Sequence, residues 1–315
     1  MGNAVYSQAS SPYNVGPMME ATASQDQALL WQRSARTFSR AQSPMRPVEE
    51  DLAHYWETLT EWMRIRGTPR VLLLGVTPEL YSLPWPKGTD LLAVDSSRAM
   101  IEAVWPGPRD AIRFADWLSL DLPKGSRDIV LCDGGLHLLS YPHGQHALIR
   151  FMHQVLSDEG LCISRLFVMP PLQETPDAVI HDLCDRKIAD QFILKLRLLM
   201  SLQASPEEGI ELGRAYDALI RVFPDLAGLA SRVGWVTERM LNMENFKGLQ
   251  YKYYFLTLDQ TIGMFQENPG GFRLHRVQTP SYPLGHCCPT LSLQRLSREA
   301  GARNAASGRS AGRTR

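Results

Sequence analysis

The clearest pattern in the sequence is a series of short hydrophobic segments between residues 70 and 168. They are too short for helices, and they lack the alternation of a strand with one exposed face, so they predict strands buried on both faces of a sheet. The predicted strands cover residues 71–74, 91–94, 111–114, 126–132 and 161–168. Helical spacing of apolar residues occurs between strands, as in residues 96–104 and 145–156. This alternation predicts an α/β fold with a parallel sheet, right-handed crossovers and helices on both faces.

Further patterns flank this region. Upstream, residues 26–41 and 48–63 predict two helices, the second of which should lie against the sheet. Downstream, apolar residues recur at helical steps from about 171 to 245 and predict a helical insertion. Strand patterns return at residues 251–258, 272–277 and 289–293. We therefore expect a Rossmann-like, doubly wound, mostly parallel seven-stranded sheet, with an antiparallel strand at its edge.

These patterns divide the chain into six parts. Both ends are rich in small and polar residues, with too little apolar surface to offset the entropy lost on ordering. The predicted parts are a disordered tail (1–24), N-terminal helices (25–67), a Rossmann-like core (68–170), a helical cap (171–245), strands that complete the sheet (246–296) and a second disordered tail (297–315).

Composition narrows the function classes. The 33 basic and 33 acidic residues cancel, and with a pI near 7.1 no global field attracts nucleic acid or anionic membrane. The five cysteines are odd in number, which is unlike a disulfide framework and fits a reducing cytoplasm. No segment approaches the roughly 18 apolar residues of a membrane span. We expect a cytoplasmic protein with no nucleic-acid or membrane partner.

Candidate chemistry lies where the predicted strands end. Gly75, Asp95, Asp116 and Asp133 each follow a strand, and the carboxyl ends of parallel strands open on one edge, where such sheets bind ligands. Asp95 comes twenty residues after Gly75, a position suited to binding ribose hydroxyls. Taken singly, Asp95 could be only a helix cap and Asp116 a turn residue. Their joint order favours one pocket.

The chain resembles a known family at these strand ends. The segments LLAVDSSRAM (91–100), FADW (114–117) and SRDIVLCDGGLHLL (126–139) are similar to the second, third and fourth motifs of class I S-adenosylmethionine-dependent methyltransferases. The resemblance implies that Gly75 passes close to the methionine part of S-adenosyl-L-methionine and that Asp95 accepts hydrogen bonds from both ribose hydroxyls. Ser96 and Met100 would flank the adenosine.

The later motifs imply the remaining contacts to this cofactor. Asp116 would meet the adenine amino group, with Trp117 beside the ring. Asp133 and Gly134 would border the methionine end. His137, four residues after Asp133, is a candidate general base for an acceptor proton. The other histidines complete no recognisable ligand set, so we expect no metal site.

The first motif departs from the family pattern. The family has an acidic residue before its first glycine and further glycines after it, where this chain has Leu73, Thr77 and Glu79. Thr77 and Glu79 would supply polar contacts in place of the missing ones. Thr77 also argues against a dinucleotide-dependent oxidoreductase, because a side chain there obstructs the approach of the backbone to a pyrophosphate.

The combined interpretation is an S-adenosylmethionine-dependent methyltransferase that acts on a small-molecule acceptor. The N-terminal helices and the helical cap are not needed to bind the cofactor, so they would cover the pocket and select the acceptor. The alternatives are a non-catalytic subunit or binding protein with this fold, a methyltransferase for protein or RNA and, least favoured, a dinucleotide-dependent oxidoreductase. The sequence leaves the acceptor and the oligomeric state open.

Overall fold

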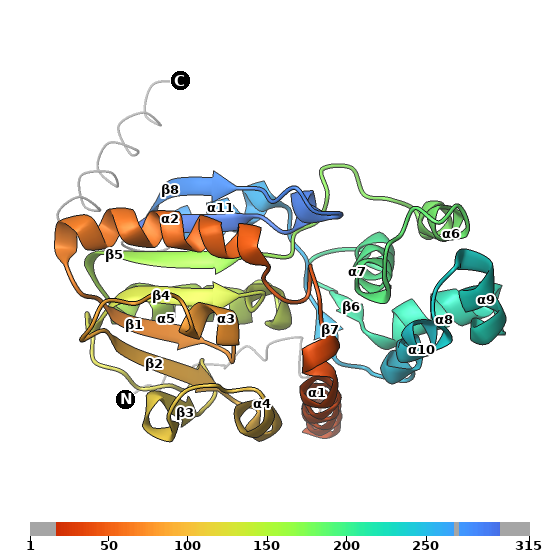
Figure 1. Cartoon of the computed structure of the whole chain (residues 1–315), viewed down its shortest axis with the longest axis horizontal. Helices are drawn as coiled ribbons and strands as arrows, with labels where there is room; N and C mark the ends of the chain where they lie inside the picture. Colours follow the sequence, from red (N-terminus) through yellow and green to blue (C-terminus); the bar gives the residue numbers. More distant parts are fainter. Residues whose placement is uncertain (1–16, 268–270, 297–315) are drawn as a thin grey trace, which may run out of the picture.

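The computed structural model describes residues 17–267 and 271–296, and within them seven strands form one mixed sheet (Figure 1). The strands are β1 (Arg70–Leu74), β2 (Asp90–Asp95), β3 (Ile112–Phe114), β4 (Arg127–Asp133), β5 (Leu156–Arg165), β8 (Phe272–Gln278) and β9 (Thr290–Arg295). Their order is β3-β2-β1-β4-β5-β9-β8. The strands β1 to β5 are parallel, and β9 is antiparallel to both β5 and β8. The predicted fold class and the hairpin at the sheet edge are confirmed.

Helices cover both faces of the sheet, which explains why its strands read as continuous hydrophobic runs. On one face, α2 (Glu49–Arg66) packs Tyr55 and Leu59 against Val71 and Leu73 of β1. On the other face, α5 (His143–Val155) and α11 (Leu258–Glu267) pack against the alternate residues Leu72 and Leu74. The predicted contact between α2 and the sheet is confirmed.

A second hydrophobic core belongs to the helical part of the chain, which extends beyond one end of the sheet (Figure 1). Its helices are α6 (Pro176–Cys184), α7 (Gln191–Leu202), α8 (Gly213–Val222), α9 (Leu226–Val233), α10 (Thr237–Leu241) and the 3-10 helix η4 (Asn242–Phe246). Two short strands, β6 (Ile210–Glu211) and β7 (Lys252–Tyr253), pair beside them. The predicted helical insertion is therefore present.

The remaining elements are short, apart from the first helix. They are α1 (Pro17–Thr37), α3 (Pro78–Tyr81), α4 (Arg98–Ala103) and the 3-10 helices η1 (Phe38–Arg40), η2 (Arg109–Ala111), η3 (Leu136–Leu138) and η5 (Gly285–Cys287). The first helix contacts both α4 on the sheet side and η4 on the helical side. It thus bridges the two parts, which Figure 1 shows on either side of it. None of the helices described is long and apolar enough to cross a membrane.

The strand predicted at residues 251–258 is wrong. Only Lys252–Tyr253 is extended in a ladder, outside the main sheet, and α11 begins at Leu258. The aromatic side chains of Tyr251, Tyr253 and Phe255 instead fill the core of the helical part. Aromatic residues are enriched in strands because they fit a half-buried surface. Here they belong to a connecting segment that packs into the core of the helical part.

Two boundaries also differ from the prediction. The fifth strand begins at Leu156 and ends at Arg165, so it lies earlier than the expected 161–168. The first helix begins at Pro17, which corrects the expected disorder of residues 17–24. Proline is favoured in the first turn of a helix, and Met18, Met19 and Glu20 are good helix formers. The expected tails at residues 1–16 and 297–315 lie outside the described residues.

Candidate active site

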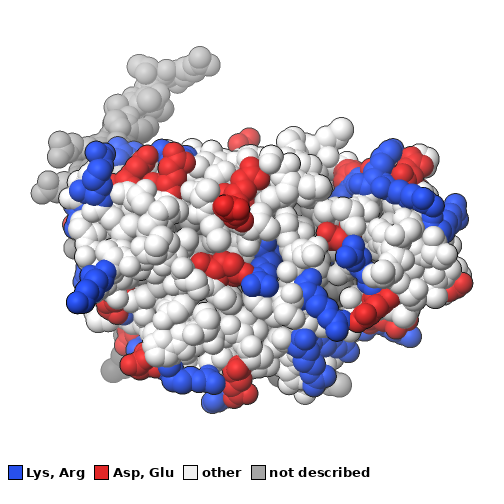
Figure 2. All heavy atoms as spheres, in the orientation of Figure 1, with Lys and Arg blue, Asp and Glu red and all other residues white. Residues whose placement is uncertain are grey.

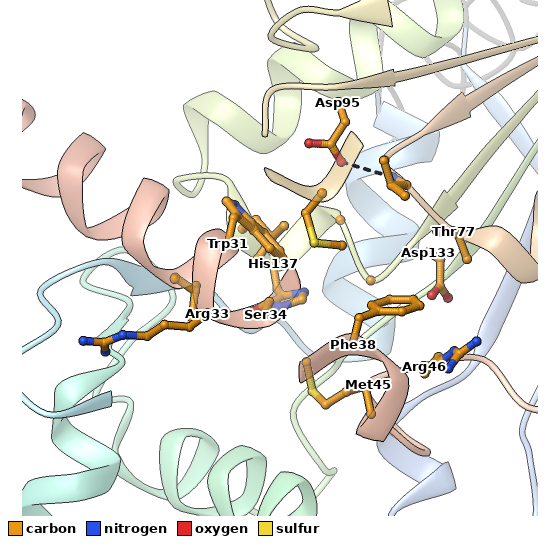
Figure 3. Close-up of a pocket in the computed structure, with 18 of the residues that line it drawn as sticks. Trp31, Arg33, Ser34, Phe38, Met45, Arg46, Thr77, Asp95, Asp133 and His137 are labelled. Atoms are coloured by element: carbon orange, nitrogen blue, oxygen red, sulfur yellow. Dashed lines mark hydrogen bonds between the residues drawn. The ribbon is translucent and has the colours of Figure 1, made fainter. Parts of the chain in front are cut away.

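A cavity of about 250 Å³ lies at the carboxyl edge of the sheet. It contains all eleven candidate residues from the sequence: Gly75, Thr77, Glu79, Asp95, Ser96, Met100, Asp116, Trp117, Asp133, Gly134 and His137. The wall opposite the strand ends comes from α1, η1 and the following turn, including Trp31, Phe38 and Met45 (Figure 3). A third wall comes from α7, η4 and β7. The N-terminal helix and the helical part therefore cover the edge where the strand-end residues meet.

Gly75 follows β1 and Asp95 ends the neighbouring strand β2, beside the point between β1 and β4 where the strand order reverses. The φ angle of Gly75 is +100°, which side chains rarely adopt, and its N–H donates to the Val94 carbonyl at 2.8 Å. The Asp95 carboxylate accepts hydrogen bonds from the backbone N–H of Val76 at 3.1 Å and of Ser97 at 2.6 Å. One bond at each oxygen leaves further lone pairs for a ligand.

The environment of Asp95 also shifts its proton affinity. Burial raises the pKa of this carboxyl to about 6, and the two backbone hydrogen bonds oppose the shift. Asp95 does not cap α4, because Ser97 is the cap and its hydroxyl accepts from the Met100 N–H at 3.3 Å. The carboxylate thus faces the cavity without the helix-capping role that its sequence position suggested as an alternative.

Met100 and Ser96 differ in exposure. Met100 is buried among Val76 and Ile101, with Trp31 and Phe38 packed against the same cluster, whereas Ser96 is exposed. Both line the cavity. Met100 therefore joins α4 to the N-terminal helix as well as forming part of the wall.

Asp116 and Trp117 are held by local hydrogen bonds. Asp116 accepts from the Leu118 N–H at 2.7 Å, so it does have the turn role considered from the sequence while it lines the cavity. The Trp117 indole N–H donates to the Val94 carbonyl at 2.8 Å. A Cβ on Gly75 would lie 3.6 Å from the Trp117 ring. The indole thus forms a fixed wall beside Gly75.

Asp133 is bound by an arginine that the sequence prediction missed. The Arg165 guanidinium donates to both carboxylate oxygens of Asp133, at 2.6 and 3.0 Å. The same guanidinium lies 3.8 Å from Asp51 and donates to the Pro44 carbonyl at 2.6 Å. Its side chain is completely buried. Both carboxylate oxygens of Asp133 therefore already accept a hydrogen bond from within the protein.

The adjacent Gly134 allows a close approach of an aromatic ring. Its φ angle is +61°, and an added Cβ would lie 2.8 Å from the Phe167 ring. Glycine is needed here for both conformation and space. Phe167 in turn lines the cavity.

Thr77 and Glu79 stand where the first motif departs from the family pattern. Thr77 is buried at the start of α3 and makes no side-chain cap. Glu79 pairs with Arg46 through one oxygen, and its other oxygen is buried with no hydrogen-bond partner among the described atoms. Glu79 thus connects the turn after β1 to the segment that follows the N-terminal helix.

His137 is surrounded by aromatic rings. It stacks on Phe255 at 5.6 Å between centroids and meets the edges of Phe167 and Tyr253 at 5.0 and 4.5 Å. Burial, with smaller effects from the charges of Lys195 and Arg165, lowers the pKa of His137 to about 3. The imidazole is therefore neutral at physiological pH and a weak proton acceptor. Among the described atoms, neither ring nitrogen has a hydrogen-bond partner.

Two further cavity residues, Gln191 and Lys195 on α7, were not predicted from the sequence. Both line the cavity, and they are four residues apart on one face of the helix. The available signal was the spacing of Gln191 and Lys195, one helical turn apart in the mostly apolar segment QFILKLRLLM, whose third polar residue is Arg197. The helix starts where Asp190 accepts from the N–H groups of Phe192 and Ile193.

Metal ligands do not gather in this cavity or elsewhere in the described chain. Residues 17–267 and 271–296 contain no group of three or more His, Cys, Asp or Glu side chains arranged to hold a metal ion. His143, His146 and His153 all lie on α5.

No protein-family model and no curated protein sequence matches this chain. Solved structures do. A protein from Rhodobacter sphaeroides, provisionally named a Zn-dependent alcohol dehydrogenase, aligns with a TM-score of 0.56 at 14% identity, over 86% of this chain and 98% of that one.

Methyltransferases also occur among the similar solved structures. A Burkholderia thailandensis 1,6-didemethyltoxoflavin-N1-methyltransferase with bound S-adenosylhomocysteine aligns with a TM-score of 0.48 at 12% identity, covering 92% of this chain and 94% of that one. The N-methyltransferase NodS from Bradyrhizobium japonicum, also with S-adenosylhomocysteine, has a TM-score of 0.45 at 9% identity, covering 85% and 99%. This chain therefore shares a fold with its solved neighbours. The fold is Rossmann-like, with a seven-stranded mixed sheet.

Proposed function

We propose that this chain transfers a methyl group from S-adenosylmethionine to a small-molecule acceptor. The observation that carries the proposal is that Gly75, after β1, and Asp95, at the end of β2, lie side by side in the lining of one covered cavity. Such a carboxylate at the end of β2 is suited to the paired hydroxyls of a ribose. A glycine at the end of β1 leaves room for the rest of the ligand to pass close to the backbone.

The residues present fit this cofactor. The Asp95 carboxylate keeps lone pairs for the ribose hydroxyls beyond its two backbone bonds. Met100 and Trp117 supply apolar walls for the adenine, and Asp116 lies beside them in the cavity lining. Asp133 and Gly134 would border the methionine end, together with Thr77 and Glu79.

The sulfonium group of the bound cofactor supplies an electrophilic methyl group. The protein then contributes mainly positioning, because holding two reactants at near-attack distance can lower the barrier by several kcal/mol. The walls from α1, η4 and α7 would hold the acceptor and exclude water. His137 is placed to orient an acceptor group by a hydrogen bond, and its lowered basicity makes it a poor acceptor of a proton.

Two observations favour this function over a dinucleotide-dependent oxidoreductase. The buried Thr77 occupies the position where close approach to a pyrophosphate requires glycine. Glu79, in the same turn and paired with Arg46, places an acidic side chain near where phosphates would bind. A sulfonium cofactor needs no phosphate-binding loop. A small acceptor also fits the interspersed acidic and basic side chains of the surface in Figure 2.

Calorimetric titration with S-adenosylmethionine, S-adenosylhomocysteine and NAD tests the proposal directly. We expect the first two to bind and NAD not to bind. Asp95→Ala should weaken binding of S-adenosylhomocysteine at least tenfold, because it removes charge-assisted hydrogen bonds worth about 1.5–3 kcal/mol each. Asp90→Ala is the matched control, since Asp90 lies at the other end of the same strand, paired with Arg127.

Failure of both sulfur ligands to bind would refute the methyltransferase function. Normal binding by Asp95→Ala would refute the ribose contact. Binding of both without turnover of any acceptor would favour a non-catalytic protein with this fold.

A further inference from the structure

Lys195 is an unusual residue within the described part of the cavity. Its side chain is only 4% exposed, yet no described carboxylate lies within ion-pair distance of its Nζ atom. Its Nζ donates a hydrogen bond to the Met45 sulfur at 3.6 Å, which is a weak acceptor. A buried ammonium group without a counter-charge is costly, so a ligand that supplies the negative charge would bind favourably there.

The other cations in the cavity lining have partners. Arg46 pairs with Glu79, Arg40 pairs with Glu238, and Arg33 donates to the Asn245 carbonyl. Burial alone lowers the pKa of Lys195 to about 8, so at pH 7 the group is still mainly protonated. Lys195 is therefore a positive charge available to a ligand.

The aromatic rings around Lys195 indicate which chemical group the rest of that ligand would carry. Its Nζ lies 5.1 Å from the ring centroid of Phe246 and 5.7 Å from that of Tyr253. Tyr253 also contacts His137, so the two polar side chains approach the same ring. A planar, apolar body would fit against these aromatic walls.

Two further groups in this corner lack partners. The Oε1 atom of Gln191 and both ring nitrogens of His137 are buried without a hydrogen bond among the described atoms. A neutral imidazole offers one donor and one acceptor, and an amide oxygen offers an acceptor. Together they can bind a hydroxyl or amine that the ligand carries beside its charge.

We propose that Lys195 binds a carboxylate of the methyl acceptor, which is a small aromatic acid, with His137 and Gln191 bonding a neighbouring hydroxyl or amine. This inference rests on the proposed function and specifies the substrate class of the same cavity. It assigns the carboxylate to the acceptor because Lys195 belongs to α7 in the helical part, whereas the predicted cofactor contacts lie at the strand ends or in the segments that directly follow them.

The test compares acids with their uncharged amides. Calorimetry on the full chain, saturated with S-adenosylhomocysteine at pH 7, would use benzoate with benzamide, salicylate with salicylamide, and indole-3-carboxylate with its amide. We expect at least one acid to bind tenfold or more tightly than its amide. The absence of any such preference in the unaltered protein would overturn the proposal without the need for a variant.

Substitution then locates the preference. Lys195→Met should abolish it and should leave the melting temperature unchanged or higher, because an apolar side chain replaces a buried charge. Lys247→Met is the matched control: Lys247 is exposed, lies outside the cavity lining and makes a similar contact at 6.0 Å from the Tyr216 ring. This control should keep the full preference.

The cofactor supplies the decisive comparison. If Lys195→Met weakens binding of S-adenosylhomocysteine tenfold, Lys195 serves the carboxylate of the cofactor and the proposal is wrong. If S-adenosylhomocysteine does not bind even the unaltered chain, the proposed function fails. The same acid and amide pairs, measured on the chain alone, would then support or overturn an acid-binding role for Lys195 independently.

Discussion

Asp95 shows how a single residue links binding to pH. Its carboxyl is buried enough to raise the pKa to about 6, and the Val76 and Ser97 N–H groups only partly oppose this shift. Because the folded pKa lies above the unfolded value near 3.8, the folded chain keeps a proton that the unfolded chain releases. The shift therefore lowers the free energy of unfolding as pH rises from about 4 to 6.

The same shift predicts a pH dependence of cofactor binding. A ribose binds best to the ionised carboxylate. Affinity for S-adenosylhomocysteine should therefore fall about tenfold from pH 7.5 to pH 5, because the free protein takes up one proton at Asp95. Burial holds the pKa of His137 at about 3, well below this range, and that of Lys195 at about 8, just above it, so a change centred near pH 6 belongs to Asp95. Calorimetry across this range should show the fall in the unaltered chain and a flat profile in Asp95→Asn. A flat profile in both would contradict the assignment.

At the scale of elements, a buried ion pair ties the site to the sheet. Arg165 at the end of β5 binds Asp133 at the end of β4, and it lies close to Asp51 of α2. The hydroxyl of Tyr55, also on α2, accepts a hydrogen bond from the backbone N–H of Arg165 at 2.8 Å. This network fixes the ends of two neighbouring strands relative to the helix that covers them.

Removing the arginine should leave the buried carboxyl groups of Asp51 and Asp133 without their shared cation. We expect Arg165→Met to lower the free energy of unfolding by about 3–5 kcal/mol, as measured by urea denaturation. Arg70→Met is the control: Arg70 also forms a bidentate pair, with Asp128, but its side chain is 45% exposed. Its loss should cost less than about 1 kcal/mol. Equal effects of the two substitutions would show that the burial of Arg165 is unimportant.

At the scale of the whole molecule, the first helix joins the two parts of the chain over the cavity. It contacts α4 beside the sheet and η4 in the helical part, and Trp31 and Ser34 from this helix line the cavity. Figure 3 shows these side chains across the cavity from Asp95 and Thr77. The cavity lining therefore combines residues of the first helix, the strand ends and the helical part.

Hydrogen exchange provides a test of this arrangement. Binding of S-adenosylhomocysteine should slow amide exchange by tenfold or more in residues 27–37 of α1, because a ligand stabilises the folded segments that surround it. Helix α9 contributes no residue to the cavity lining and serves as the internal control. Equal protection of both helices would indicate a global change, and no protection of α1 would mean that this helix does not cover the ligand.

Much of the architecture could be predicted from local pattern. The segments 71–74 and 91–94 have the continuous apolar pattern of fully buried strands because helices cover both faces of the sheet. The residues that follow them lie at one edge because parallel strands share a direction. Local pattern failed at residues 251–258, where aromatic residues that favour a strand pack into the core of the helical part.

The sequence by itself thus determined the alternation of strands and helices, the fold class and the placement of Gly75 and Asp95 at one edge, since each follows from the local order of apolar and polar residues. Only the tertiary structure decided that Arg165 binds Asp133 and that Lys195 reaches the cavity without a counter-charge from the described residues. The physical reason is that such contacts join residues far apart in the chain. Their partners depend on how whole elements pack, and no local periodicity records that packing.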